Sequence, residues 1–214
     1  MESAACELEI TTFADFLNKC GARIEGQMPR IVVEGVASLH GAEHTIIPDR
    51  IEAGTFMIAA AVSNGELTLK DCRIDHLCGV CRYTSPRWFE HRKTDKGVNV
   101  SSSRRLDPTE ITTQPYPGFD GLAKPQTMVL LSLADGNSVV TEKIFPDRFL
   151  HVAELNRMGT RLARKARPSL SKASRNSSGA PVMAPTVRQP RWCSRAQLGY
   201  GQTLAPHVPS RPRL

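Results

Sequence analysis

Near the start of the chain, the spacing of apolar residues predicts one helix followed by one strand. Apolar side chains recur at helical intervals over residues 13–20, with Thr11 and Thr12 placed to cap the helix and Gly21 placed to end it. Residues 30–33 carry a short apolar run, which is typical of a buried strand.

A second helix and a second strand follow in the same order. Asp49 is placed to cap a helix that carries apolar side chains over residues 51–60 and stops at Asn64 and Gly65. Residues 66–69 alternate between polar and apolar side chains, as a strand with one buried face does. Helix and strand therefore alternate at short intervals.

This alternation is repeated along the chain. Residues 127–136 repeat the pattern of residues 56–65, and residues 155–161 match residues 17–23 at close to twice that separation. A repeat of about 70 residues is too long for a common solenoid. It predicts an α/β assembly built from units of helices and paired strands.

The charges are divided unevenly between a body and a tail. Twelve of the 28 basic residues lie from Arg157 onward, where there is no acidic residue, so this tail has a net charge of +12. The preceding body has 16 basic and 21 acidic residues, a net charge of −5. The pI of 9.3 therefore describes the tail and not a basic nucleic-acid-binding body. Because residues 160–214 are rich in Pro, Ser and Arg without an apolar period, we expect them to be disordered.

The sequence gives no indication of membrane insertion or export. The longest apolar run, residues 56–62, is far too short to span a bilayer. Residues 1–9 lack the basic and apolar regions of a secretory signal, and their acidity argues against a transit peptide. Without a signal, the six cysteines are most simply reduced thiols. We expect a cytoplasmic protein, or a plastid-stromal one if a transit peptide lies upstream.

Three blocks, residues 39–56, 113–119 and 145–155, resemble the enolpyruvyl transferase family in order and spacing. Residues 48–56 and 145–155 resemble the branch that opens peptidoglycan synthesis more than the shikimate-pathway branch. The resemblance implies an inside-out α/β barrel of two domains, each built from three βαβαββ units. This chain would hold only part of that barrel.

The resemblance also predicts how the chain is divided. Residues 1–47 would form the end of the first domain, residues 48–159 part of the second, and residues 160–214 a degraded basic tail. The match fails abruptly in patches, and a shifted reading frame over residues 121–124 restores the family pattern. We therefore expect a truncated, partly frame-damaged fragment of an enolpyruvyl transferase.

The function implied by the resemblance is transfer of enolpyruvyl from phosphoenolpyruvate to the 3-hydroxyl of UDP-N-acetylglucosamine, through a tetrahedral intermediate and without a cofactor. This chemistry needs a general acid, a base near the sugar hydroxyl, and cations that hold phosphate and carboxylate. In the family, the Lys-Asn motif, the mobile-loop acid and the uridine-binding Arg all precede the point that matches Met1. The chain alone is therefore predicted to be inactive.

Five positions carry the remaining site predictions. Leu122 stands where the family has its Asp base, and a leucine cannot accept a proton. Asp120 is a substitute through a loop shift, or an ordinary turn Asp before a glycine. Arg148 is predicted to bind a carboxylate or phosphate, or to be a structural Arg at a strand-to-helix junction. Ile144 is predicted to contact the UDP-sugar through its backbone, or to pack in a core strand. Arg188 is a further predicted substrate contact.

Two other functions compete with enolpyruvyl transfer. Three thiolates and one imidazole would make a closed zinc site from Cys72, His76, Cys78 and Cys81. However, a single Cys-x-x-Cys without a second pair at standard spacing is a weak signal, and the sequence predicts no metal. The basic tail would bind nucleic acid without sequence preference, but Trp192 and Tyr200 are too few for a stacking platform. A non-catalytic remnant that acts only through protein or nucleic-acid contacts is the remaining alternative.

Overall fold

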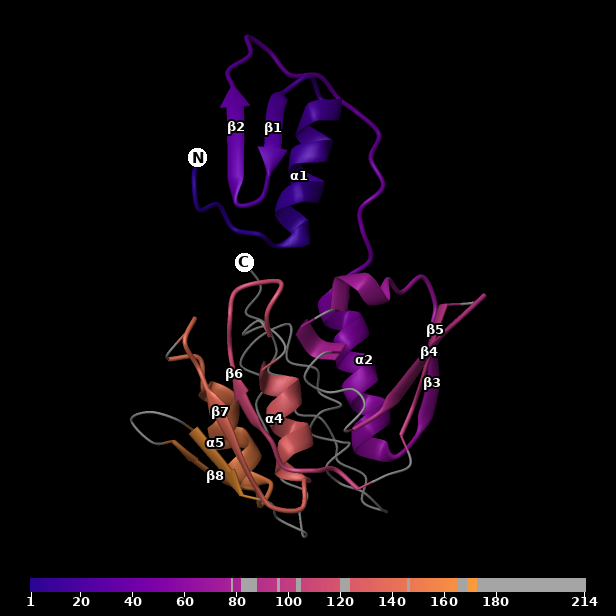
Figure 1. Ribbon diagram of the computed structural model, residues 1–214, viewed down its shortest axis with the longest axis vertical. Helices are drawn as coiled ribbons and strands as arrows, with labels where there is room; N and C mark the ends of the chain where they lie inside the picture. Colours follow the sequence, from indigo (N-terminus) through magenta and orange to yellow (C-terminus); the bar gives the residue numbers. More distant parts are fainter. Residues whose placement is uncertain are drawn as a thin grey trace, which may run out of the picture.

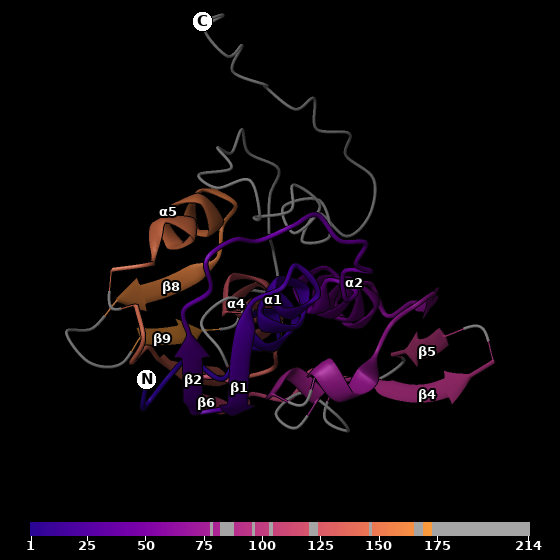
Figure 2. The same ribbon diagram turned by 90° about the horizontal axis from the view of Figure 1, so that it is seen from above.

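The structure is a computed structural model, and its described parts are residues 1–77, 79–81, 88–95, 97–102, 105–119, 124–145, 147–164 and 169–172. Figures 1 and 2 show an N-terminal helix and hairpin connected by an extended segment to a larger α/β body. Most of the tail predicted over residues 160–214 lies outside the described residues.

The N-terminal part consists of α1 (Leu8–Lys19) and an antiparallel hairpin of β1 (Arg23–Gln27) and β2 (Arg30–Glu34). The helix is confirmed, but the predicted threonine caps are wrong because the helix begins earlier. Thr12 lies inside it and donates from Oγ1 to the Leu8 carbonyl oxygen at 3.0 Å. Gly21 does end the helix, with a φ of +96°.

The middle part consists of α2 (Arg50–Ser63), β3 (Glu66–Leu69), the 3₁₀ turn η1 (Ile74–Leu77), β4 (Glu90–Thr94) and β5 (Gly97–Ser101). Asp49 caps α2 as predicted, since its Oδ1 accepts from the backbone N–H of Ile51 at 2.8 Å. Asn64 ends the helix in the left-handed conformation. The three strands form an antiparallel sheet in the order β3-β5-β4.

The last part is one βαβαββ unit. Its elements are β6 (Glu110–Thr112), α4 (Lys124–Ser132), β7 (Asn137–Thr141), α5 (Leu150–Arg157), β8 (Arg161–Arg164) and β9 (Ser169–Lys172). The sheet order is β6-β7-β9-β8, with β6 and β7 parallel and the other pairs antiparallel. The predicted unit is therefore present, and its last two strands extend beyond residue 160.

The internal repeat has a structural counterpart. The sheet order β3-β5-β4 of the middle part returns in the last unit as β7-β9-β8, with the strands in the same sequence order. The buried helices α2 and α4 occupy equivalent places in their units. They meet where Gln126 Nε2 donates to Thr55 Oγ1 at 2.9 Å, and the sequence separation of these two residues is 71, which is the period of the repeat.

The core lies between helices, with the sheets on the outside. Met57 and Ile58 of α2 pack with Leu130 and Leu131 of α4, and none of these side chains is more than 1% exposed. All five residues of the outer strand β4 are exposed. Figure 1 shows α2 and α4 side by side between the two sheets. Helices inside and sheets outside is the arrangement that the family resemblance implies.

Candidate functional site

A hydrogen-bond network joins the end of β6 to the turn that follows β7. Thr113 Oγ1 donates to Glu142 Oε1 at 2.7 Å and accepts from the Lys143 N–H at 2.8 Å. The same Glu142 oxygen accepts from the backbone N–H groups of Ile144 and Phe145 at 2.7 and 2.9 Å. This carboxylate therefore fixes the backbone of the turn that carries Ile144.

The second oxygen of Glu142 pairs with a buried lysine. Lys124 Nζ lies 2.6 Å from Glu142 Oε2, and the two side chains are 0% and 2% exposed. The ammonium also lies 4.1 Å from the centroid of the Phe149 ring. Burial raises the pKa of Glu142, but the hydrogen bonds from Lys124, the Phe145 N–H and Thr113 outweigh burial and leave the pKa below its usual value.

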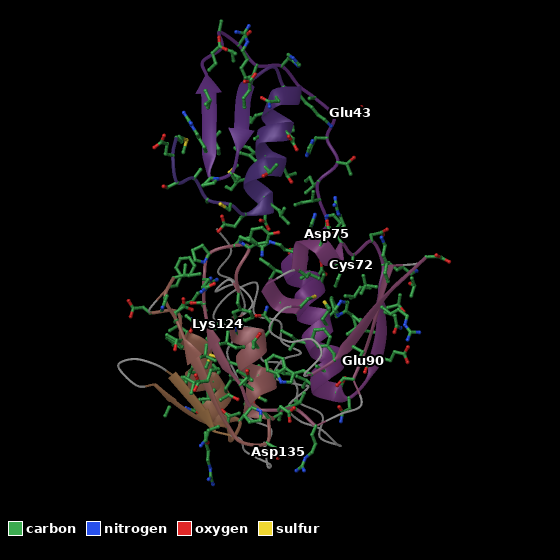
Figure 3. All side chains as sticks on the ribbon, in the orientation of Figure 1. Glu43, Cys72, Asp75, Glu90, Lys124 and Asp135 are labelled. Carbon is green, nitrogen blue, oxygen red and sulfur yellow. The ribbon has the colours of Figure 1, made fainter. Side chains whose placement is uncertain are left out.

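This pair is next to the segment predicted to hold the base. Lys124 is the first residue of α4, and Phe119, which is 1% exposed, is the last described residue before it. Gln114 N–H donates to the Phe119 carbonyl oxygen at 2.8 Å and closes that loop. Leu122 and Asp120 lie between these two anchors but outside the described residues, as does Arg188. Figure 3 marks Lys124 beside α4.

Ile144 and Arg148 lie on the same turn between β7 and α5. Both are partly buried. The Arg148 guanidinium lies 5.5 Å from the centroid of the Phe145 ring, and the Arg148 N–H donates to the Phe145 carbonyl oxygen at 3.1 Å. Glu142 thus contacts the Ile144 turn and Lys124 directly, while Arg148 is linked to the same turn through Phe145.

His151 is buried next to this cluster and packs against α4. It is 6% exposed, and its Nε2 lies 3.0 Å from the Met128 sulfur on α4. Burial, together with the charges of Lys124 and Arg148, lowers the pKa of His151 to about 4. The imidazole is therefore neutral near pH 7, and the positive charge of the cluster comes from Lys124 and Arg148.

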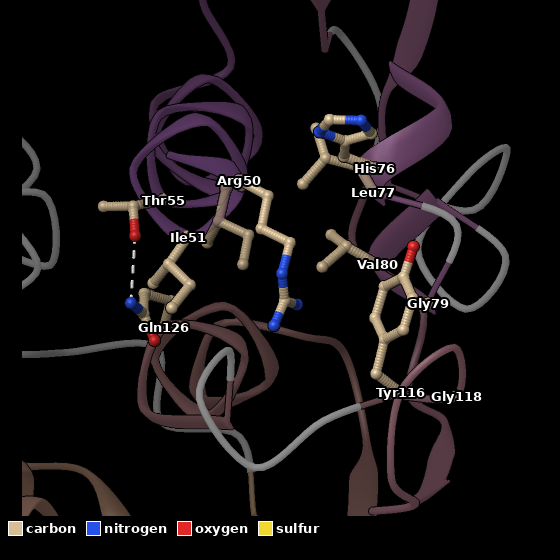
Figure 4. A pocket seen from close by; sticks show the side chains of 12 residues that line it. Arg50, Ile51, Thr55, His76, Leu77, Gly79, Val80, Tyr116, Gly118 and Gln126 are labelled. Carbon is tan, nitrogen blue, oxygen red and sulfur yellow. Dashed lines mark hydrogen bonds between the residues drawn. The ribbon is translucent and has the colours of Figure 1, made fainter. Parts of the chain in front are cut away.

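A second cluster connects the N-terminal part to the body. Arg50 is 8% exposed, and its Nε donates to Glu9 Oε1 of α1 at 3.0 Å. Its guanidinium lies 4.9 Å from the centroid of the Tyr116 ring. Figure 4 shows Arg50 lining a small pocket together with Tyr116 and Gln126. The residues that line this pocket all belong to the body, and the bond from Arg50 to Glu9 connects them to the N-terminal part.

The alternative zinc site has no geometric support in the residues that the structure describes. Cys78 lies outside them, and no three potential metal ligands come together among the rest. Burial, followed by the charge of Asp75, raises the pKa of the Cys72 thiol and disfavours the thiolate that zinc binds. Figure 3 shows Cys72 and Asp75 well away from Lys124.

The fold places the chain in the class of the enolpyruvyl transferases. The family model described as EPSP synthase (3-phosphoshikimate 1-carboxyvinyltransferase) matches residues 1–186, and the chain belongs to that family. The enolpyruvyl transferase NikO from Streptomyces tendae superposes with a TM-score of 0.64 at 22% identity, over 77% of this chain and 40% of that one. This likeness shows the fold.

Closer relatives by sequence belong to one branch of the family. The chain is 45% identical over 189 residues to the UDP-N-acetylglucosamine 1-carboxyvinyltransferase of Granulibacter bethesdensis, covering 88% of this chain and 45% of that enzyme. It is 44% identical to the enzyme of the same name from Nitratidesulfovibrio vulgaris, covering 88% of this chain and 46% of the relative. The chain therefore spans less than half the length of these relatives.

Sequence reasoning missed the residues that organise the site. The Glu142 pair with Lys124 and the Arg50 pair with Glu9 join positions far apart in the chain, and charge patterning alone does not reveal such pairs. One available signal was Glu142 directly before the Ile144 turn. Another was Arg50 directly after the capping Asp49, within the first family block.

The described helices include none that is long and apolar enough to cross a membrane.

Proposed function

We propose that this chain forms one side of a site that transfers enolpyruvyl from phosphoenolpyruvate to the 3-hydroxyl of UDP-N-acetylglucosamine. The observation that carries the proposal is the 45% identity over 189 residues to a UDP-N-acetylglucosamine 1-carboxyvinyltransferase. The position of Ile144 and Arg148 on one turn, held by Glu142, supports it. The proposal implies the first committed step of peptidoglycan precursor synthesis and a cytoplasmic location.

The reaction defines what the site residues would do. The sugar hydroxyl adds to C2 of phosphoenolpyruvate, its proton goes to a base, and an acid protonates C3. The tetrahedral intermediate then loses phosphate and a C3 proton to give the enolpyruvyl ether. Arg148 is proposed to hold the carboxylate or phosphate, and the Ile144 backbone to contact the sugar nucleotide. Arg188 is proposed as a further substrate contact.

Glu142 and Lys124 are proposed as positioning residues. Glu142 binds the N–H groups of Ile144 and Phe145, and it pairs with Lys124 at the start of α4. A shift of this carboxylate would therefore move the Ile144 turn and the end of the base segment together. Effective transfer depends on holding such groups to within a fraction of an ångström.

At one position the sequence lacks a residue type that this reaction requires. Leu122 stands at the family's base position and cannot accept a proton. For this reason we propose that the chain alone does not release phosphate from phosphoenolpyruvate. The alternative is a non-catalytic remnant that acts only through contacts with a partner, and Leu122 is the observation that favours it.

A chimeric enzyme tests the proposed transfer. Residues 48–159 of this chain would replace the matching segment of the Granulibacter bethesdensis relative, with residues 120–123 restored to the family pattern Pro-Thr-Asp-Leu and Lys124 kept, so that its pair with Glu142 is retained. We expect phosphate release that requires both phosphoenolpyruvate and UDP-N-acetylglucosamine. A folded chimera that binds neither substrate and releases no phosphate would show that this segment is no longer a transferase segment.

A further inference from the structure

Arg50 stands at a helix end that does not favour a positive charge. It is the first residue of α2, where the backbone N–H groups of the helix already carry a partial positive charge. Its side chain is nevertheless buried, at 8% exposed. Because the charge does not stabilise α2, we looked for its role in what the guanidinium contacts outside this helix.

The first contact of Arg50 is with the N-terminal part. Its Nε lies 3.0 Å from Glu9 Oε1, and its Nη2 lies 3.4 Å from Glu9 Oε2, so two nitrogens of the guanidinium face the two carboxylate oxygens. Glu9 lies in the first turn of α1, and its side chain is 51% exposed. A half-exposed carboxylate of one part thus holds a buried cation of the other.

The second contact of Arg50 is with the loop between β6 and α4. The guanidinium carbon lies 4.9 Å from the centroid of the Tyr116 ring, within the range of a cation–π contact. Both side chains line the same pocket, Arg50 from α2 and Tyr116 from the loop (Figure 4). One side chain therefore joins α1 of the N-terminal part to a loop of the last unit.

The loop of residues 114–119 is tight, so a displacement at one point is passed along it. The Gln114 N–H donates to the Phe119 carbonyl oxygen at 2.8 Å and closes the loop. A Cβ added at Gly118 would lie only 2.7 Å from the Gln114 Cβ, so the two sides of the loop are in close contact. Phe119 is 1% exposed and directly precedes residues 120–123, the segment predicted to hold the base.

We propose that Arg50 is a positioning residue that makes the closed conformation of this loop depend on the bond to Glu9. While Glu9 holds the guanidinium, Arg50 lies against the Tyr116 ring and keeps the loop closed next to residues 120–123. The inference rests on the proposed function for the role of residues 120–123 in transfer, whereas the link itself is a property of the folded chain. It gives α1 an influence on the base segment.

Amide hydrogen exchange of the full 214-residue chain tests this link. Glu9→Gln removes the charge that holds Arg50 and keeps the size of the side chain. We expect the Gln114 and Gly118 amides, which are hydrogen-bonded within the loop, to exchange at least about threefold faster, as loss of a cation–π contact implies. The Asp135 amide, which is hydrogen-bonded outside the loop, should keep its rate.

Three further variants make the test specific. Tyr116→Leu keeps an apolar side chain but removes the ring, so the loop should already exchange faster, and adding Glu9→Gln should give no further change. Glu9→Asp keeps the charge at a shorter reach and should give an intermediate rate. Glu25→Gln is the matched control, because Glu25 is an exposed carboxylate on β1 of the same part. Thermal melting of each variant checks that it folds.

The outcomes separate this link from general stability and from catalysis. Unchanged exchange at Gln114 and Gly118 in Glu9→Gln would overturn the inference, and so would equal acceleration at Asp135, because that result would reflect a general loss of stability. Effects of Glu9→Gln and Tyr116→Leu that add in the double variant would also overturn it. Faster loop exchange together with an inactive restored chimera would contradict the proposed function alone.

Discussion

At the scale of single residues, the site depends on one buried carboxylate. Glu142 accepts hydrogen bonds from Thr113 and from two backbone N–H groups and also pairs with Lys124. Loss of the Lys124 ammonium would leave these other donors to Glu142 in place, whereas loss of the Glu142 charge would remove the carboxylate that neutralises a fully buried ammonium. The two members of the pair should therefore differ in their sensitivity to substitution.

Glu142→Gln should lower the free energy of unfolding by about 3 kcal/mol, because it removes the negative charge that balances the buried Lys124 ammonium. Lys124→Gln should lower the free energy of unfolding by a smaller amount, since the Glu142 carboxylate keeps its other hydrogen bonds. The double variant should cost less than the sum of the two single changes. Urea unfolding of the four proteins measures the coupling, and additive costs would show that the pair does not act as one unit.

The stability of the protein should fall as the pH falls from 6.5 towards 5. His151 has its pKa lowered to about 4 from its usual value of 6.5. In that window the unfolded chain therefore takes up a proton that the folded chain does not. His151 should therefore lower the free energy of unfolding by about 2 kcal/mol across this window.

Comparison of His151→Gln with the native chain tests this pH dependence by thermal or urea unfolding. The variant should lose much of the dependence, although His76, whose pKa is lowered first by burial, keeps part of it. The unfolding experiments are kept above pH 5, because Glu142, whose pKa is also below its usual value, contributes to the pH dependence of stability at lower pH. His91→Gln on the exposed strand β4 is the control, and an equal effect there would contradict the assignment to His151.

Arg148→Ala in the restored chimera should raise KM for phosphoenolpyruvate by about tenfold or more, because one charge-assisted contact is lost. Arg148→Lys should recover only part of the loss, since lysine keeps the charge but not the paired donors. If Arg148 has only a structural role at the start of α5, both variants will lower the melting temperature and leave KM unchanged.

At the scale of elements, the repeat explains why much of the fold could be predicted. The residues at helix ends, such as Asp49, Asn64 and Gly21, act locally, so their roles follow from sequence. The threonine caps were wrong because Leu8 and its neighbours extend α1 by a turn. Within the strand predicted as buried, Ile31 is buried but Val32 and Val33 are exposed, because burial depends on what packs against a strand, and an apolar run does not contain that information.

Asn18 and Asn156, which match in the sequence repeat and make the same two bonds to Ile24 and Leu162, give a prediction at this scale. Asn156→Ala should lower the free energy of unfolding by about 1 to 3 kcal/mol, because it removes two hydrogen bonds to Leu162. Leu162 is 6% exposed, so its N–H would be left without an acceptor. Asn18→Ala should cost less, since water reaches the equivalent groups at Ile24. Chemical unfolding of both variants measures the difference, and a larger cost at Asn18 would contradict this explanation.

At the scale of the whole molecule, the sequence indicated the family and the βαβαββ unit but not how the parts are held together. Three family blocks and the internal repeat were sufficient for the first two. The joint between Arg50 and Glu9 and the grouping around Glu142 depend on three-dimensional proximity, so no local pattern predicted them. All the predicted site residues stay predictions. Leu122, Asp120 and Arg188 lie outside the described residues, and Ile144 and Arg148 are proposed substrate contacts.

The most direct test of this account compares two chimeras that differ only at residues 120–123, one with this chain's own residues and one with the family pattern that restores an aspartate at Leu122, with Lys124 kept in both. The measured quantity is the rate of phosphate release from phosphoenolpyruvate in the presence of UDP-N-acetylglucosamine. A positioned general base contributes at least about 10²-fold, so the restored chimera should be faster by that factor. Equal rates in two folded chimeras would contradict the account, because the base position would then be irrelevant to what this segment does.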